Sequence, residues 1–281
     1  MRKGKRHKVK GRRKVWNFTF AFCFLTSNFV TAAQGRGAVP AANAPKEAAP
    51  IDLTGYWVSI VTEDWRYRMV TPTKGDYQAV PMNADARKVA DGWDPAADEA
   101  AGNQCKSYGA AAIMRVPGRV HITWQDDKTL RLEIDAGTQT RLFPFEASPS
   151  GTPSWQGDSV AQWELPGGRG AGGGRGGGGG GGGVGGLPNP NAPPPKGGSL
   201  KVVTTNMRAG YLRKNGVPYS EKAVLTEYFD IAPQRNGDQL LVVTAIVEDS
   251  RYLTQSFVVS SHFRKQADAK GWDPTPCSAT W

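Results

Sequence analysis

The stretch "RVHITWQDDKTLRLEID", residues 119–135, decides the fold class. Apolar residues occupy every second position from Val120 to Trp124 and again from Leu130 to Ile134, with polar residues between them. This period of two is typical of a half-buried antiparallel strand. The letters "DDK" between the two halves are typical of a turn. The stretch therefore predicts a β-hairpin with one buried face.

Similar segments recur along most of the chain. The predicted strands span residues 55–61, 65–70, 119–125, 129–135, 138–145, 158–165, 199–207, 222–231, 238–249 and 255–265. Only "NADARKVADGW" has a helical pattern, with Asn83 as N-cap and Gly92 as stop. Successive strands with one short helix indicate an up-and-down barrel or a sandwich. We predict an all-β protein with a single antiparallel barrel of about ten strands, a domain that spans residues 51–281.

The N-terminal segment is typical of a secretory signal. A basic start, "MRKGKRHKVKGRRKVW", precedes a short apolar stretch that ends in small residues near Ala33. We predict a signal peptide over residues 1–33 and an Ala/Pro-rich linker over 34–50, hence an exported protein, periplasmic or extracellular. Arg12 and Arg13 also fit a twin-arginine signal. An uncleaved membrane anchor is the competing interpretation.

The charge distribution argues against nucleic-acid binding. Nine of the 35 Lys and Arg residues lie in residues 1–16, so the rest of the chain is close to neutral. The glycine run "GGRGAGGGRGGGGGGGGVGG", residues 167–186, has two arginines and no aromatic residue to stack on bases. Because it separates two predicted strands, we interpret residues 166–198 as a disordered Gly/Pro-rich insertion at a hairpin tip. Such an insertion costs the fold little.

Two cysteines remain after the predicted leader. Cys105 and Cys277 would form a disulfide in an exported protein, and the alternative is a pair of free buried thiols. With no CxxC motif and only His121 and His262 in the mature chain, the sequence supports no metal site and no cofactor.

Several segments carry a family resemblance. "DLTGYW", "CKSYGAAAIMRVPGRVHITWQ", "SLKVVTTNMRAGYLRKNGVPYSEKAVLTEYF" and "VEDSRYLTQSF" resemble an uncharacterised family of secreted bacterial β-barrel proteins, over nearly all of residues 51–265. The resemblance implies export and a barrel but no activity. In related sequences a short turn follows the "WE", so the glycine insertion departs from the pattern.

A second resemblance concerns the first strand. Gly55-Tyr56-Trp57 resembles the G-x-W start of lipocalins and other calycin-like barrels. That resemblance implies that Trp57 closes the barrel floor against a basic residue of a late strand, with Arg264 as the match and a cation-π contact as the closure. Alternatively, Trp57 is an ordinary core aromatic residue.

Two charged residues lie on apolar strand faces. Glu227 shares a face with Leu225 and Phe229, and Arg141 shares one with Phe143. A buried charge is costly unless it is paired. Arg141 and Glu227 are therefore expected either to neutralise each other, the interpretation we favour, or to line a cavity. With Trp163 and Tyr228 they form our predicted ligand-binding set.

These features predict a protein that binds a small, partly apolar ligand, of unknown identity, inside its barrel. Nucleic acid is not expected as a partner, and neither is a membrane span after leader cleavage. The oligomeric state stays open. The alternatives are a hydrolase that uses strand-end carboxylates such as Asp135, Glu248 and Asp249, and a cell-envelope module for protein interaction.

Overall fold

The computed structural model describes residues 43–148, 150–165 and 197–280, which all fall in one compact unit. The predicted signal peptide, most of the predicted linker and nearly all of the glycine-rich insertion lie outside the described residues. Within the described ranges, no helix is both long and apolar enough to cross a bilayer.

The unit is all-β, with nine strands in one antiparallel sheet and two in a separate hairpin. The strands are β1 (Gly55–Ile60), β2 (Arg119–Asp126), β3 (Thr129–Ile134), β4 (Gln139–Pro144), β5 (Asp158–Glu164), β6 (Ser199–Thr205), β7 (Gly210–Arg213), β8 (Val217–Tyr219), β9 (Val224–Pro233), β10 (Gln239–Glu248) and β11 (Phe257–Gln266). Their order in the large sheet is β4-β3-β2-β1-β11-β10-β9-β6-β5. The predicted hairpin of residues 119–135 is confirmed as β2 and β3.

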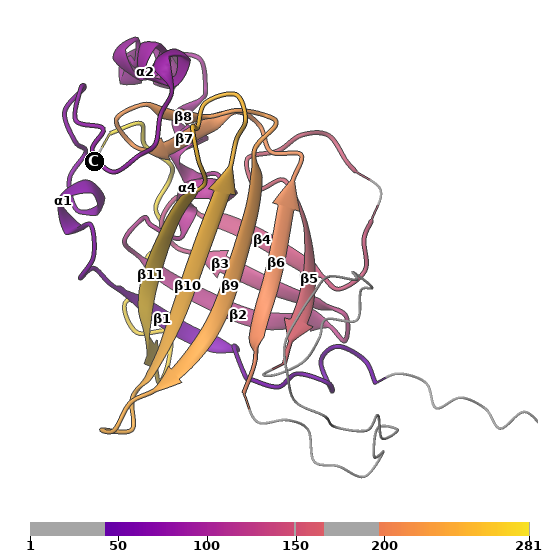
Figure 1. Cartoon of the computed structure of the whole chain (residues 1–281). Helices are drawn as coiled ribbons and strands as arrows, with labels where there is room; N and C mark the ends of the chain where they lie inside the picture. The colour runs from indigo at the N-terminus through magenta and orange to yellow at the C-terminus, as the bar shows by residue number, and fades with distance from the viewer. Residues whose placement is uncertain (1–42, 149, 166–196, 281) are drawn as a thin grey trace, which may run out of the picture. The chain divides into compact units, whose positions relative to one another are not determined.

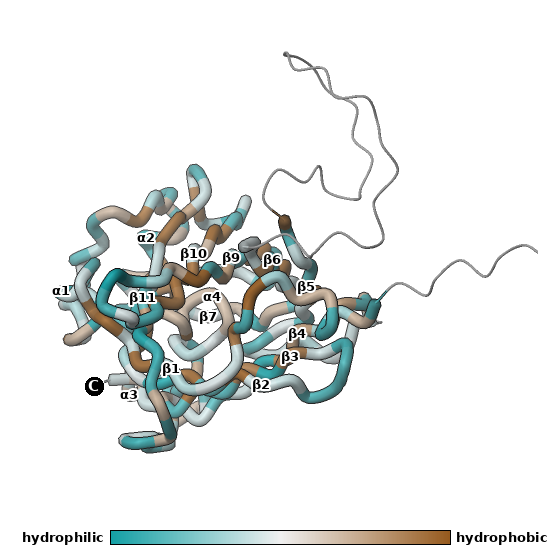
Figure 2. Tube along the Cα trace, turned by 90° about the horizontal axis from the view of Figure 1, so that it is seen from below, coloured by the Kyte–Doolittle hydropathy of each residue, from teal (hydrophilic) through white to brown (hydrophobic). Residues whose placement is uncertain are grey.

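The sheet curls into a nearly closed barrel. Viewed from below, the nine strands follow one another around a ring, with α4 and β7 visible within it (Figure 2). The predicted single antiparallel barrel is therefore confirmed. No backbone ladder joins the two edge strands β4 and β5 among the described residues, which leaves a seam between them.

Short helices and the β7–β8 hairpin gather at one end of the barrel (Figure 1). The helical elements are α1 (Trp65–Arg68), α2 (Ala84–Asp91), α3 (Pro95–Ala100), the 3₁₀ helix η1 (Gln104–Tyr108) and α4 (Ala110–Ile113). The expected helix is α2, and the Asn83 side chain caps it by accepting a hydrogen bond from the Ala86 amide. The predicted strand over residues 65–70 is wrong, because α1 begins there instead.

Alternation along the strands builds the barrel interior. In β3 the apolar residues Leu130, Leu132 and Ile134 are all buried, whereas the polar residues between them are partly exposed. A second buried cluster, which includes Leu212, Val217 and Tyr219 of the β7–β8 hairpin, lies at the capped end. The cap thus buries the apolar end of the barrel that the nine strands leave open.

Trp57 is fully buried in the core, and its indole nitrogen donates to the Leu53 carbonyl at 2.9 Å. The cation above the Trp57 ring is Lys265, whose Nζ lies 4.4 Å from the ring centroid. The partner of Trp57 is therefore Lys265 and not the predicted Arg264. Trp57 pairs in register with Lys265, and the neighbouring Arg264 is exposed on the outer face. A shift of one residue along a strand exchanges the two faces of a sheet.

A disulfide joins Cys105 of η1 to Cys277 near the C-terminus. The bond ties the capping elements to the segment that follows β11, across 172 residues of sequence. The disulfide predicted from the cysteine count is present in the structure.

Candidate functional site

Arg141 and Glu227 form an ion pair inside the barrel. The two nitrogens Nη1 and Nη2 of Arg141 donate to the two carboxylate oxygens of Glu227 at 2.9 and 2.6 Å. The side chains are only 1% and 0% exposed. Arg141 Nη2 also donates to Thr204 Oγ1, which lies 2.8 Å from Ser159 Oγ. The predicted partners therefore meet, and they neutralise each other.

This network links the two sides of the seam. Arg141 comes from edge strand β4, whereas Glu227, Thr204 and Ser159 come from β9, β6 and the opposite edge strand β5. Side chains thus join the barrel where a backbone ladder is missing. A cleft of about 390 Å³ opens along the seam, lined in part by Arg141, Gln156 and Ser159.

Trp163 and Tyr228, the other two predicted ligand-binding residues, lie elsewhere. Trp163 packs with Trp124 and Phe145, and its indole nitrogen donates to the Pro45 carbonyl at 2.8 Å. Tyr228 lies on the outer face of β9, where Lys201 Nζ is 5.7 Å from its ring centroid. The structure does not bring these two aromatic residues together with the ion pair.

A different group of residues forms a polar pocket at the capped end of the barrel. We call it the arginine pocket, a small cavity of about 20 Å³ bounded by Tyr67, Arg68, Arg115, Leu212, Arg213 and Lys214. The three arginines are only 2%, 6% and 3% exposed. A cavity of this size holds one or two water-sized groups.

Local backbone features place each arginine. Arg68 ends α1, and Arg115 follows α4 in the turn before β2. In the β7–β8 hairpin the register shifts between Tyr211 and Arg213, so Leu212 and Arg213 are both buried although they are neighbours. A β-bulge re-aims side chains in this way, and here it turns Arg213 into the pocket.

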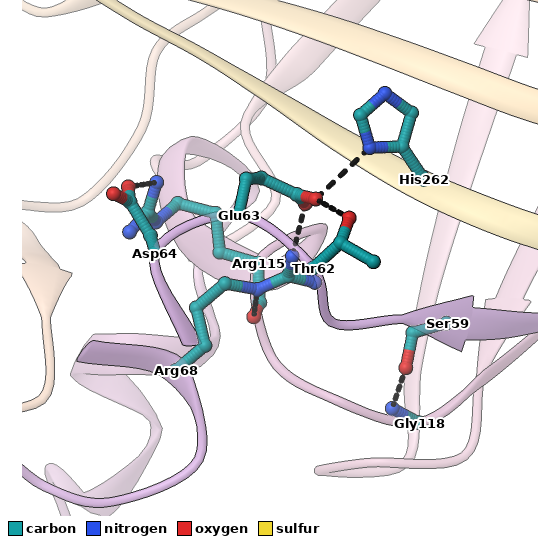
Figure 3. Close-up of polar contacts among 8 residues, drawn as sticks. All are labelled: Ser59, Thr62, Glu63, Asp64, Arg68, Arg115, Gly118 and His262. Atoms are coloured by element: carbon teal, nitrogen blue, oxygen red, sulfur yellow. Dashed lines mark hydrogen bonds and ion pairs between the residues drawn. The ribbon is translucent and has the colours of Figure 1, made fainter. Parts of the chain in front are cut away.

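Two carboxylates from the β1–α1 connection partly neutralise the pocket (Figure 3). The Glu63 carboxylate accepts hydrogen bonds from Arg68 and from Thr62 Oγ1, the latter at 2.7 Å. It also pairs with His262 Nδ1 at 2.9 Å. Asp64 accepts from Arg115 Nη1 at 3.1 Å. Asp64 itself has a left-handed backbone with φ of 50°, a conformation that Asp tolerates better than most residues.

The arginines keep unused donors. Nη2 of Arg68, Nη2 of Arg115, and both Nε and Nη2 of Arg213 are buried without a hydrogen-bond partner. Arg213 donates through Nη1 to the Gln78 carbonyl at 2.6 Å and lies over the Tyr67 ring, but no described carboxylate is within ion-pair distance of it. The pocket therefore has more positive charge and more donors than its own acceptors use.

Burial and mutual repulsion act on the cations. Burial, followed by the charge of Arg115, lowers the pKa of Arg213 to about 10. Burial also lowers the pKa of Arg68 and Arg115, although the nearby carboxylates oppose the effect. Burial lowers the pKa of Lys214 to about 7. Because this environment disfavours the charged forms of these side chains, it is suited to a bound anion, which would stabilise them.

The low pKa of Lys214 predicts a pH dependence of stability. An unfolded lysine has a pKa of about 10.4, so between about pH 7 and 10 the unfolded chain binds the extra proton and the free energy of unfolding rises with pH. Replacing Lys214 with Met should remove up to about 1 kcal/mol per pH unit of that slope. Urea unfolding of both proteins at pH 7 and pH 9 measures it, and equal slopes would contradict the assignment.

Two of the three strand-end carboxylates of the hydrolase hypothesis, Asp249 and Asp135, have structural partners. Asp249 accepts from the amide and hydroxyl of Ser220 at 2.6 and 2.8 Å, and Asp135 accepts from the amides of Arg119 and Ala136 at 2.7 Å. In the described part of the chain no group of three His, Cys, Asp or Glu side chains is placed to hold a metal ion.

Sequence reasoning missed the arginine pocket. Its cations come from three distant segments, and no spacing motif connects them. One signal was present, because Arg115 follows the apolar run "AAAIM" and Arg213 follows "GYL". An arginine directly after a buried apolar run is expected to be buried as well. A buried charge is costly unless it is paired, and this is the rule that identified Arg141 and Glu227.

Comparison of the chain with protein-family models, curated proteins and solved structures gives no match. The fold and the site themselves define the class: an antiparallel, nearly closed β-barrel with a capped end and a buried arginine pocket beneath the cap.

Proposed function

We propose that this protein is an exported, lipocalin-like barrel that binds a small, partly apolar ligand through a compact anionic group, a carboxylate, phosphate or sulfate, held in the arginine pocket. The observation that carries the proposal is the set of buried, unpartnered guanidinium nitrogens on Arg68, Arg115 and Arg213. Buried donors without acceptors are costly, by about 1 to 3 kcal/mol each and more for charged groups. An oxyanion would supply the missing acceptors.

The chemistry of the donors favours an oxyanion. Guanidinium groups present planar pairs of N–H donors that match carboxylate and phosphate oxygens. The arginines have fixed positions, because Arg68 Nε donates to the Arg115 carbonyl at 2.8 Å and Arg213 Nη1 donates to the Gln78 carbonyl. A preorganised site of this kind loses little side-chain entropy on binding.

The walls of the pocket favour a ligand with an apolar part. Ala112, Val116 and Leu212 line it together with the ring of Tyr67. Since the cavity has room for only one or two water-sized groups, it would take one or two oxygen atoms of the oxyanion, and the rest of the ligand would extend past these apolar side chains. This arrangement supports the partly apolar ligand that the sequence predicts.

A titration with sulfate tests the proposal. At constant ionic strength, sulfate should raise the melting temperature of the protein, and Arg213→Met should weaken its binding about 10- to 100-fold, since a hydrogen bond to a charged group contributes about 1.5 to 3 kcal/mol. Arg264→Met, which changes an exposed arginine on the outer face, is the matched control and should leave the affinity unchanged. Equal sulfate binding by wild type and Arg213→Met would refute the site.

One observation favours an interaction module as a second function. Trp65, Met69 and Val70 expose most of their side-chain surface in and just after α1. Adjacent exposed apolar side chains are typical of surfaces that bind another molecule. If this face binds a protein, Trp65→Ser should weaken that complex and leave the sulfate titration unchanged.

A further inference from the structure

We propose that Lys214 captures the ligand covalently, by forming an imine with a carbonyl carbon next to the anionic group that the arginines hold. The ligand class would be small 2-oxo acids and related carbonyl compounds with an adjacent anionic group. This inference rests on the proposed function, because the arginine pocket orients the carbonyl toward the amine.

The position of Lys214 supports the proposal. It follows Arg213 directly, lines the same cavity as Arg68 and Arg115, and is 5% exposed. The turn that carries it is firmly held, because the buried Asn215 side chain donates to the carbonyls of Thr73 and Asp76 at 3.1 and 2.9 Å. An amine and an anion site that share one cavity give a bound oxo acid a short path to reaction.

The turn also depends on a glycine. Gly216 has φ of +83°, and a Cβ there would lie 2.3 Å from the Cβ of Trp93. Glycine alone meets both conditions, the left-handed backbone and the close approach of Trp93. The hairpin therefore returns directly after Lys214, which keeps the amine at the pocket.

The chemical state of the amine favours attack on a carbonyl. Burial lowers the pKa of Lys214 to about 7, so a large part of the side chain is neutral at neutral pH. Reactive lysines in imine-forming sites have a low pKa because of burial or neighbouring cations. Burial meets this condition for Lys214, and the amine lines the same cavity as the three arginines.

The reaction balances without an oxidant or a reductant. The Nζ lone pair of neutral Lys214 attacks the carbonyl carbon, a C–N bond forms, and the carbonyl oxygen takes up a proton. That proton comes from the attacking nitrogen. The resulting carbinolamine then loses its hydroxyl and the remaining N–H proton together as water, and the C=N bond forms. The Tyr108 hydroxyl lies 2.7 Å from Nζ and can pass protons in these steps. Burial raises the Tyr108 pKa, which keeps this hydroxyl protonated.

Reductive trapping with glyoxylate tests the inference. Full-length mature protein is incubated with glyoxylate and cyanoborohydride at pH 7.5, and the carboxymethylated lysines are located by peptide mass spectrometry. Lys214 should react at least about tenfold faster than the exposed Lys88, because a lysine of ordinary pKa is almost entirely protonated at this pH. Sulfate should slow the labelling of Lys214 and leave that of Lys88 unchanged. Lys214→Arg, which retains the positive charge, should show only the background labelling.

The outcomes separate the inference from the proposed function. If sulfate binds but glyoxylate labels Lys214 no faster than Lys88, the imine inference is overturned and the anion site stands. If acetaldehyde labels Lys214 as fast as glyoxylate does, and sulfate does not slow the labelling, the proposed ligand class of 2-oxo acids is overturned. Absence of both sulfate binding and labelling overturns the inference together with the proposed function.

Discussion

Replacing Arg141 with Met is expected to lower the free energy of unfolding by about 3 to 5 kcal/mol. The change leaves the carboxylate of Glu227 buried, charged and without its partner, in a position that is 0% exposed. It also removes the side chain that joins edge strand β4 to β6 and β9 across the seam. Urea unfolding followed by tryptophan fluorescence measures the loss.

A double variant separates the unpaired charge from the loss of packing. Arg141→Met combined with Glu227→Leu should recover most of the stability, because replacing a whole buried ion pair with apolar residues is often close to neutral. The exposed pair Lys128–Glu146 is the matched control, and Lys128→Ala should change stability by at most about 1 kcal/mol. A single Arg141 variant as stable as the wild type would show that the pair does not hold the seam.

Loss of the disulfide between Cys105 and Cys277 is expected to have an effect of similar size. The bond closes a loop of 172 residues, for which chain entropy gives a stabilisation of about 5 kcal/mol. Cys105→Ser combined with Cys277→Ser should lower the midpoint of urea unfolding accordingly.

The reducing agent itself supplies the control for this prediction. Dithiothreitol should destabilise the wild type to the level of the double variant and leave the double variant unchanged. If the double variant unfolds at the same urea concentration as the oxidised wild type, the bond contributes nothing to stability.

The sequence was sufficient to predict most of the barrel. The pattern of alternating residues identifies all nine strands of the large sheet, since burying one face of a sheet imposes a period of two on side chains such as Leu130, Leu132 and Ile134. The elements of the cap were harder to predict. Residues 65–70 contain aromatic and apolar residues that favour strands, but their first four residues form the short helix α1, because tertiary contacts outweigh local propensity in so short a segment. The strands β7 and β8 are too short to show a period.

The candidate site could be predicted only in part. The burial rule found Arg141 and Glu227, because both lie within strands whose faces the pattern defines. The resemblance of Gly55-Tyr56-Trp57 to a lipocalin start implied Arg264 as the partner of Trp57 instead of Lys265, because the pairing register of β1 and β11 is a long-range property. The arginine pocket was not found, since the fold brings together a helix end, a loop and a bulge that are remote in sequence.

The most direct test of the anion site is a crystal structure of the protein soaked with selenate, in which the anomalous scattering of selenium locates the ion. We expect a selenate ion within hydrogen-bond distance of the free guanidinium nitrogens of Arg68, Arg115 and Arg213. A well-ordered structure at high selenate concentration with only water in this cavity, and selenate only at surface lysines or arginines, would contradict the account.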